Sequence, residues 1–187
     1  YSNPKWIAAD LIAQAEHDEL SQSILITNNK NLIYKVKEFI NLQTKLLPKR
    51  RIISSSLNNF GIIIFAKNIK EIANITNKIA PEHLEICTKK PENYLKFINN
   101  AGSIFLGYFS PEAMGDYLAG PNHVLPTSGT ARFSSGLSVF DFLKKQSIIK
   151  ISKTGIERLG PTVISLANYE NLHGHASSIK VRLKGKI

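Results

Sequence analysis

The sequence predicts an α/β protein with a mostly parallel, Rossmann-like sheet covered by helices on both faces, followed by a small helix-rich tail. Short apolar runs alternate with stretches of helical periodicity, which is the pattern of βαβ units. The first two runs are almost entirely apolar, as expected of strands buried on both faces. The runs are SILIT at 23–27, FGIIIFA at 60–66, HLEICT at 83–88 and SIFL at 103–106.

Apolar residues at helical spacing predict helices around these strands. The helices are expected over residues 4–17, 30–47, 68–79 and 91–99. Pro4 stands at an early helical position, where proline is tolerated. A further short strand is expected at 52–54. Ligands of such sheets bind outside the carboxyl ends of the strands, so we expect the site there.

The alternation ends after Leu106, and a helix-rich tail follows. Its expected elements are helices at 139–145, 154–167 and 171–182 and a short strand at 147–151. Because the composition shifts near residues 134–138, we expect one domain over 1–137 and a small helical segment over 138–187.

Length and composition limit the possible classes of protein. A chain of 187 residues can bury one good core and has room for a small appendage. No apolar run approaches the roughly 20 residues that span a bilayer. The chain starts at Tyr1 and its only methionine is Met114, so we expect a piece of a longer protein. The single cysteine, Cys87, excludes an internal disulfide and fits a reducing, cytoplasmic compartment.

The net charge of +10 raises the hypothesis of a nucleic-acid or polyanion binder without catalysis. The basic residues are scattered over predicted helices and turns. They lack the interleaved aromatic residues of a base-stacking surface. Binding of nucleic acid is therefore the alternative, and not the leading, interpretation.

The stretch Gly115–Arg132 (GDYLAGPNHVLPTSGTAR) has no clear helical or strand period. Its glycines and prolines break regular structure, and its polar residues favour turns. Long loops of this kind are often functional, although an ordered structural loop is also possible. Asp116 and His123 give this loop a carboxylate that could bind a metal or orient an imidazole.

Three other groups of residues could carry chemistry. Glu82 and His83 adjoin a predicted strand and could transfer protons, although an exposed turn is an alternative. Gln14 and His17 are spaced to share one helix face, which would also suit a solvated helix end. In the tail, His173 and His175 lie about 200° apart on a helix, so both can face one site only if the helix starts between them. Glu170 could approach His175 at such a start.

No dinucleotide fingerprint, nucleophile elbow, P-loop or H-E-x-x-H motif is present. The residues alone therefore suggest a metal site of histidine, aspartate and possibly glutamine beside a Glu-His acid–base pair. A metal-dependent hydrolase could use the same pair without NAD.

Several long motifs resemble the C-terminal part of the histidinol dehydrogenase family. They are AADLIAQAEHDELSQSILIT, APEHLEI, AGSIFLG, GDYLAGPNHVLPTSGTARFSSGLSV and LHGHASSIKVRL. Together they run through nearly the whole chain in the expected order. The resemblance implies a zinc-dependent, NAD-linked enzyme that oxidises L-histidinol via L-histidinal to L-histidine in two hydride transfers. It also implies that residues 1–137 are the C-terminal part of a Rossmann-like domain that binds substrate and zinc.

The resemblance also implies roles for individual residues. One zinc ion per subunit would be bound by Gln14, His17, Asp116 and His175. Glu82 and His83 would be the catalytic pair. The implied substrate contacts are Gln14, His17, His83, Asp116, His123, Glu170 and His175. The family is a homodimer in which the tail completes the neighbour's site, so Glu170, His175 and His123 would act in trans.

The family's principal NAD contacts and a substrate-binding serine would precede Tyr1, so the NAD-binding residues are unknown. We therefore expect this piece to be inactive by itself. Two positions depart from the family pattern: Gly136 stands where a proline is expected, and His173 where an aspartate is usual. Neither coincides with an implied ligand.

Overall fold

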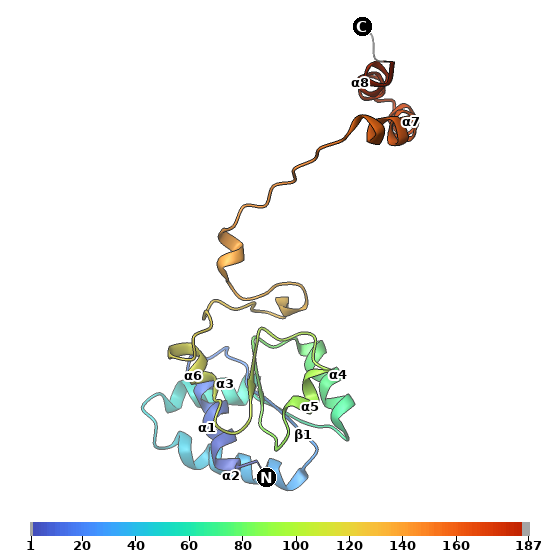
Figure 1. The fold of residues 1–187 in the computed structure, drawn as a ribbon. Coiled ribbons are helices and arrows are strands. Elements are labelled where there is room, and N and C mark those ends of the chain that lie inside the picture. The colour runs from blue at the N-terminus through green and yellow to red at the C-terminus, as the bar shows by residue number, and fades with distance from the viewer. Residues whose placement is uncertain (1, 185–187) are drawn as a thin grey trace. The chain divides into compact units, whose positions relative to one another are not determined.

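The computed structural model describes residues 2–184, which divide into two compact units between Phe142 and Leu143 (Figure 1). The division comes a few residues after the boundary expected from composition. The helices and strands of the first unit are α1 (Pro4–Ala15), β1 (Ile24–Thr27), α2 (Lys30–Thr44), α3 (Arg50–Phe60), β2 (Ile62–Phe65), α4 (Ile69–Ile79), β3 (His83–Ile86), α5 (Glu92–Leu95), β4 (Ser103–Leu106) and α6 (Glu112–Tyr117). Two 3-10 turns, η1 (Thr130–Arg132) and η2 (Val139–Phe142), follow them.

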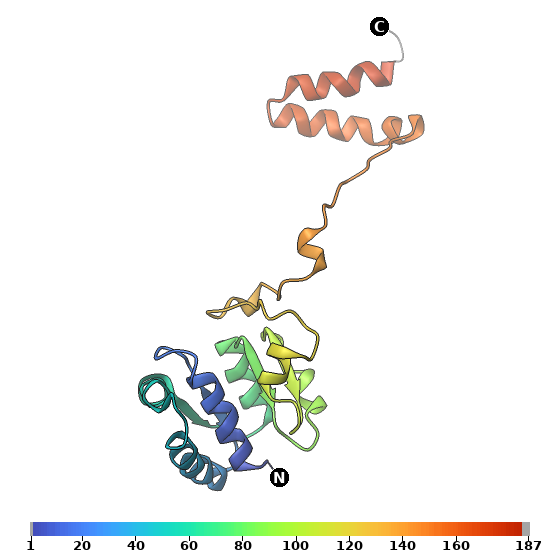
Figure 2. The same ribbon diagram turned by 90° about the vertical axis from the view of Figure 1, so that its left-hand side faces the viewer.

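The strands form two parallel pairs, and this confirms the predicted α/β class. β1 pairs with β2, with Ile24 opposite Ile62. β3 pairs with β4, with His83 opposite Ser103. Helices connect the members of each pair, as parallel strands require. Helices α1 to α3 lie on one side of the strands, and α4 and α5 lie on the other (Figures 1 and 2).

The core of the first unit lies between α1, α2 and α3. Ile7 and Ala8 of α1 pack with Val36 of α2, and Ile12 of α1 packs with Ile53 of α3. Val36 and Ile53 have no exposed surface. Burying such a side chain fully contributes about 1.5–3 kcal/mol. This packing fixes α1, whose last turn contains Gln14 and leads to His17.

The end of α4 places the predicted acid–base pair. Ala80 is the C-cap of α4 and has a left-handed conformation (φ 52°). Pro81 then ends the helix, because proline cannot continue it. Backbone hydrogen bonds from Gly102 N to Pro81 O and from Ser103 N to Glu82 O join the next residues to the start of β4. Glu82 and His83 are thus held at the amino end of β3.

Two of the predicted strands are wrong. Residues 52–54 lie inside α3, where Ile53 and Ser56, spaced one turn apart, are both buried. A short apolar run cannot be distinguished from a buried helix segment by periodicity alone. Residues 147–151 form no strand, and Ile148 and Ile149 are 94% and 81% exposed. No strand of the described chain pairs with them, and β-propensity alone does not form a strand.

Several predicted boundaries also differ. The expected helix over 91–99 shrinks to the single turn α5, and the one over 139–145 to the 3-10 turn η2. The loop Gly115–Arg132 begins inside α6, so Asp116 lies on a helix. A helix this short shows too little periodicity to be recognised in the sequence.

The second unit is a pair of packed helices, α7 (Lys153–Tyr169) and α8 (His173–Lys184). Its most buried residues are small: Gly160, Ala167 and Ala176. A Cβ atom at Gly160 would come within 3.0 Å of side-chain atoms of Ile179 and Leu183, so this glycine allows the helices to approach closely. Among residues 2–184, no helix is both long and apolar enough to cross a membrane.

Candidate functional site

A pocket of about 520 Å³ in the first unit brings several predicted site residues together. It extends along β4 and is closed by α6 and the loop after it. The pocket lining includes residues from both ends of β4, so this pocket is not confined to the carboxyl ends of the strands, where the sequence led us to expect the site. Its lining includes His83, Ser103, Ile104, Phe105, Leu106, Met114, Gly115, Asp116, Asn122, His123 and Leu125.

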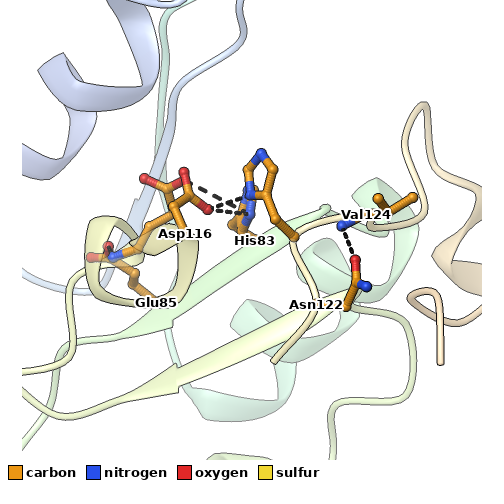
Figure 3. Close-up of polar contacts among 7 residues, drawn as sticks. His83, Glu85, Asp116, Asn122 and Val124 are labelled. Atoms are coloured by element: carbon orange, nitrogen blue, oxygen red, sulfur yellow. Dashed lines mark hydrogen bonds and ion pairs between the residues drawn. The ribbon is translucent and has the colours of Figure 1, made fainter. Parts of the chain in front are cut away.

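His83 is the most enclosed of the described histidines. Its ring centroid lies 6.0 Å from that of Phe105. Its Nε2 atom lies 3.8 Å from both Glu112 Oε1 and Asp116 Oδ1, too far for a hydrogen bond (Figure 3). This nitrogen is buried without a hydrogen-bond partner in the described residues. Burial lowers the pKa of His83 although Glu82 and Asp116 raise it, which favours a neutral imidazole that can accept a proton.

Asp116 lies on α6, whose position depends on two contacts with the strands. The backbone N–H of Glu112, the first residue of α6, donates to Glu85 Oε1 of β3 (2.8 Å). Gly115 lies directly against the Phe105 ring, where an added Cβ would come within 2.6 Å of a ring carbon. These contacts turn Asp116 toward His83, and its side chain is only 13% exposed.

The electrostatics of α6 keep its two carboxyl groups in different states. Burial raises the pKa of Asp116, but hydrogen bonds with Glu112 and His123 and the nearby imidazoles outweigh it and lower that pKa. Burial and the hydrogen bond to Asp116 raise the pKa of Glu112 to about 7. Asp116 is therefore the ionised member near neutral pH and the stronger ligand for a cation.

His123 approaches Asp116 from the loop after α6. Its Nδ1 lies 2.7 Å from Asp116 Oδ1, and its ring is stacked against His83 with centroids 6.5 Å apart. Asn122 Oδ1 accepts the backbone N–H of Val124 (2.7 Å), which turns the chain at this point (Figure 3). His123 remains 60% exposed at the edge of the pocket.

Anchors farther along hold this loop on the first unit. Pro126 is buried and packs against Gly102. A Cβ atom added at Gly102 would lie 3.1 Å from the ring of Pro126. The Arg132 guanidinium donates to the carbonyl oxygens of Gly129 and Lys78, the latter in the last turn of α4. The loop is thus ordered by contacts distant from it in sequence.

The structure also brings His17 to Asp116. Side-chain donor atoms of His17, Glu112 and Asp116 lie within 4.8 Å of one another, as do those of His83, Asp116 and His123. Nitrogen and carboxylate oxygen donors are among those that zinc takes in proteins. The residues present therefore fit a zinc ion.

The predicted partners of His17 and His83 lie close to them in sequence. α1 ends at Ala15, so His17 lies just beyond the helix, and half-buried Gln14 occupies its last turn. Glu82 is half-buried beside His83, and its charge acts on both His83 and Glu112.

The remaining predicted residues belong to the second unit. Glu170 is the C-cap of α7, and His173 and His175 lie in the first turn of α8. All three are exposed. α8 starts at His173, so it does not start between the two histidines as their convergence on one site would require.

Sequence reasoning missed Glu112 and Glu85. Pro111 followed by Glu112 and Asp116 at helical spacing was a signal for two carboxylates on one helix face. His83 and Glu85 are two residues apart on a strand, which places them on one face. Burial raises the pKa of the nearby Cys87 to about 12, so this thiol is not an activated nucleophile.

Comparison with known proteins shows the family of the chain. Residues 1–183 match the family model for histidinol dehydrogenase. The chain is 57% identical over 182 residues to histidinol dehydrogenase of Clostridium acetobutylicum, which covers 97% of this chain and 42% of that protein. It is 54% identical over 186 residues to that of Pelagibacter ubique, covering 100% of this chain and 44% of the relative.

A solved structure is also similar. The crystal structure of histidinol dehydrogenase from Elizabethkingia anophelis matches with a TM-score of 0.92 and 41% sequence identity. The match covers 98% of this chain and 42% of that one. The chain thus spans less than half the length of the proteins it matches.

Proposed function

The chain belongs to the histidinol dehydrogenase family, and we propose on this basis that it forms part of a zinc-dependent, NAD-linked dehydrogenase. The enzyme oxidises L-histidinol via L-histidinal to L-histidine by two hydride transfers. The observation that carries the proposal is the convergence of His83, Asp116 and His123 on one pocket, with His17 beside Asp116.

In the proposed mechanism His83 is the general base. It would take the proton of the substrate hydroxyl, and NAD, when bound, would supply the hydride acceptor. Its buried Nε2 without a hydrogen-bond partner and its lowered pKa support this role, because both keep a lone pair free near neutral pH. Glu82 activates the water that adds to the aldehyde before the second hydride transfer.

We propose that Gln14, His17, Asp116 and His175 hold the zinc ion. When bound, it supplies a fixed positive charge that orients the imidazole and amine of the substrate. The approach of His17 to Asp116 supports the assignment of these two residues, and the family resemblance supports Gln14 and His175. His123 hydrogen-bonds to the Asp116 carboxylate and lies within reach of the same substrate.

We propose that the remaining parts of the site come from outside the first unit. Glu170 and His175 are proposed to reach the site of a second copy of the chain in a homodimer. The NAD contacts are proposed to lie in a segment preceding residue 1. The apolar side chains exposed on the second unit, among them Leu166 at 60% and Tyr169 at 88%, support a covering partner.

The proposal is tested by NADH release from the full-length enzyme with L-histidinol, NAD and zinc. We expect about two NADH for each histidinol consumed, loss of activity with a chelator and recovery when zinc is restored. No NADH under saturating conditions would contradict the proposal. Hydrolysis of an ester or amide without NAD would instead favour the metal-dependent hydrolase.

A further inference from the structure

Helix α6 carries both Glu112 and Asp116 but has little stability of its own. It contains six residues, and its N-cap, Pro111, offers no side chain to the unpaired backbone N–H groups of the first turn. An isolated helix of this length does not persist in water. Its geometry must therefore be imposed by neighbouring parts of the fold.

Glu85 supplies one such contact from the neighbouring strand. Its Oε1 atom accepts the N–H of Glu112 at 2.8 Å, so a side chain of β3 takes the place of the missing cap. Since Glu85 stands two residues after His83, both side chains lie on the same face of β3 (Figure 3). One strand thus holds the proposed base and the group that binds the helix opposite it.

Glu85 also reaches α1, the helix that leads to His17. Donor atoms of Asp10, Glu85 and Cys87 lie within 4.8 Å of one another, and the Cys87 thiol lies 3.8 Å from Glu85 Oε2. Burial and the Asp10 charge raise the pKa of Glu85 to about 7. A protonated Glu85 can donate to Asp10 while its other oxygen accepts from Glu112.

We infer that Glu85 is a positioning residue that sets the spacing of His17, His83 and Asp116 by joining α6 and α1 to β3. It does not line the pocket, so its effect on a ligand passes through these three residues. The inference rests on the proposed function for its zinc measurement. Its structural measurement, the order of α6, does not depend on that function.

The test compares two side chains of similar length in the full-length enzyme. Glu85→Met fills the space but cannot accept from the Glu112 N–H, whereas Glu85→Gln keeps an acceptor oxygen and a donor for Asp10. For Glu85→Met we expect zinc affinity, measured by competition with a chelator, to fall about 10- to 100-fold, the range for residues that orient a ligand. Glu85→Gln should bind zinc nearly as the wild type does.

A second measurement follows the helix directly. In the zinc-free enzyme, Glu85→Met should speed amide hydrogen exchange across Glu112–Tyr117, and Glu85→Gln should not. If Glu85→Met does not fold, Glu85→Asp replaces it in the test. Its side chain is one methylene shorter, so its carboxyl group lies farther from the Glu112 N–H. We expect the same direction of change for this variant.

Asn77→Ala is the matched control for general destabilisation. Asn77 donates to Phe97 O (2.7 Å) and accepts the N–H of Asn99 (2.8 Å), and none of these three residues lines the pocket. Its loss should lower the thermal midpoint without changing zinc affinity.

Three outcomes bear on the inference separately from the proposed function. Wild-type zinc affinity and exchange in Glu85→Met would overturn it, as would an equal loss of zinc affinity in Asn77→Ala. A wild-type enzyme that neither binds zinc nor releases NADH would overturn the proposed function instead. In that case the exchange rates of the Met and Gln variants still decide the role of Glu85.

Discussion

The two units of the chain differ in how far they enclose the proposed site residues and large apolar side chains. In the first, Ile53 is completely buried and Asp116 is enclosed beside two histidines. In the second, Leu166 and Tyr169 are mostly exposed, and Glu170 and His175 face solvent. The first unit therefore orders its site residues through its own packing.

This difference shows which half of the proposed site is preorganised. His83, Asp116 and His123 are held within the first unit by contacts that require no other chain. The second unit presents its functional candidates on a small helical pair. Their role depends on the surface against which that pair docks.

The largest effect is expected within the preorganised half. His83→Asn in the full-length enzyme removes the proposed base and should lower kcat by about 10²- to 10⁴-fold. Zinc content, measured by metal analysis, should stay unchanged. His173→Asn at an exposed position of the second unit is the control and should keep full activity. Normal turnover in His83→Asn would rule out the base assignment.

Truncating an apolar side chain should affect stability differently in the two units. Ile53→Ala should lower the free energy of unfolding by about 2–5 kcal/mol, because it leaves a cavity in the first unit. This loss should not depend on protein concentration. Leu166→Ala should lower the thermal midpoint only through association, so its effect should vary with concentration. If Leu166→Ala has no effect at any concentration, its face is not part of an interface.

Zinc binding should reveal whether the second unit contributes a ligand. His175→Ala should weaken zinc binding at least about 100-fold, beyond the range for residues that only orient a ligand. His173→Ala, two positions earlier, is the matched control. Full zinc occupancy in His175→Ala together with loss in His173→Ala would reassign the ligand to His173.

Mixing two inactive variants tests whether the units act in trans. In a heterodimer of His83→Asn and His175→Ala, one site pairs an intact first unit with an intact second unit. Random reassociation should therefore restore about a quarter of wild-type activity, since half of the dimers then hold one good site in two. No recovery would mean that both units of one site come from the same chain.

The smallest effect expected is a change in the pH dependence of stability. The folded-state pKa of Glu85 is about 7, above its ordinary value of 4.5. Its contribution to stability is therefore complete below pH 4.5 and is lost as the pH rises through 7. In the zinc-free enzyme, the thermal midpoint of Glu85→Gln should therefore depend less on pH between pH 4.5 and 7 than that of the wild type. Glu170→Gln, exposed in the second unit, is the control; an equal change there would contradict the assignment.

Local patterns in the sequence were sufficient for the fold class and for four strands. Apolar runs such as 60–66 and helices with a wide apolar face, such as α2, reflect burial that each segment requires separately. The long motifs also led to the correct family. The same reasoning failed at residues 52–54 and 147–151, where strand-like composition lacked a neighbouring strand.

The arrangement of the site depends on contacts between segments far apart in the chain. The sequence could identify Glu82, His83 and Asp116 as candidates because their residue types and motifs are local. Residue patterns alone could not show that His17 approaches Asp116, or that Glu85 binds the start of α6 across 27 positions. Such contacts arise only when packing brings the segments together, and tertiary structure alone decides them.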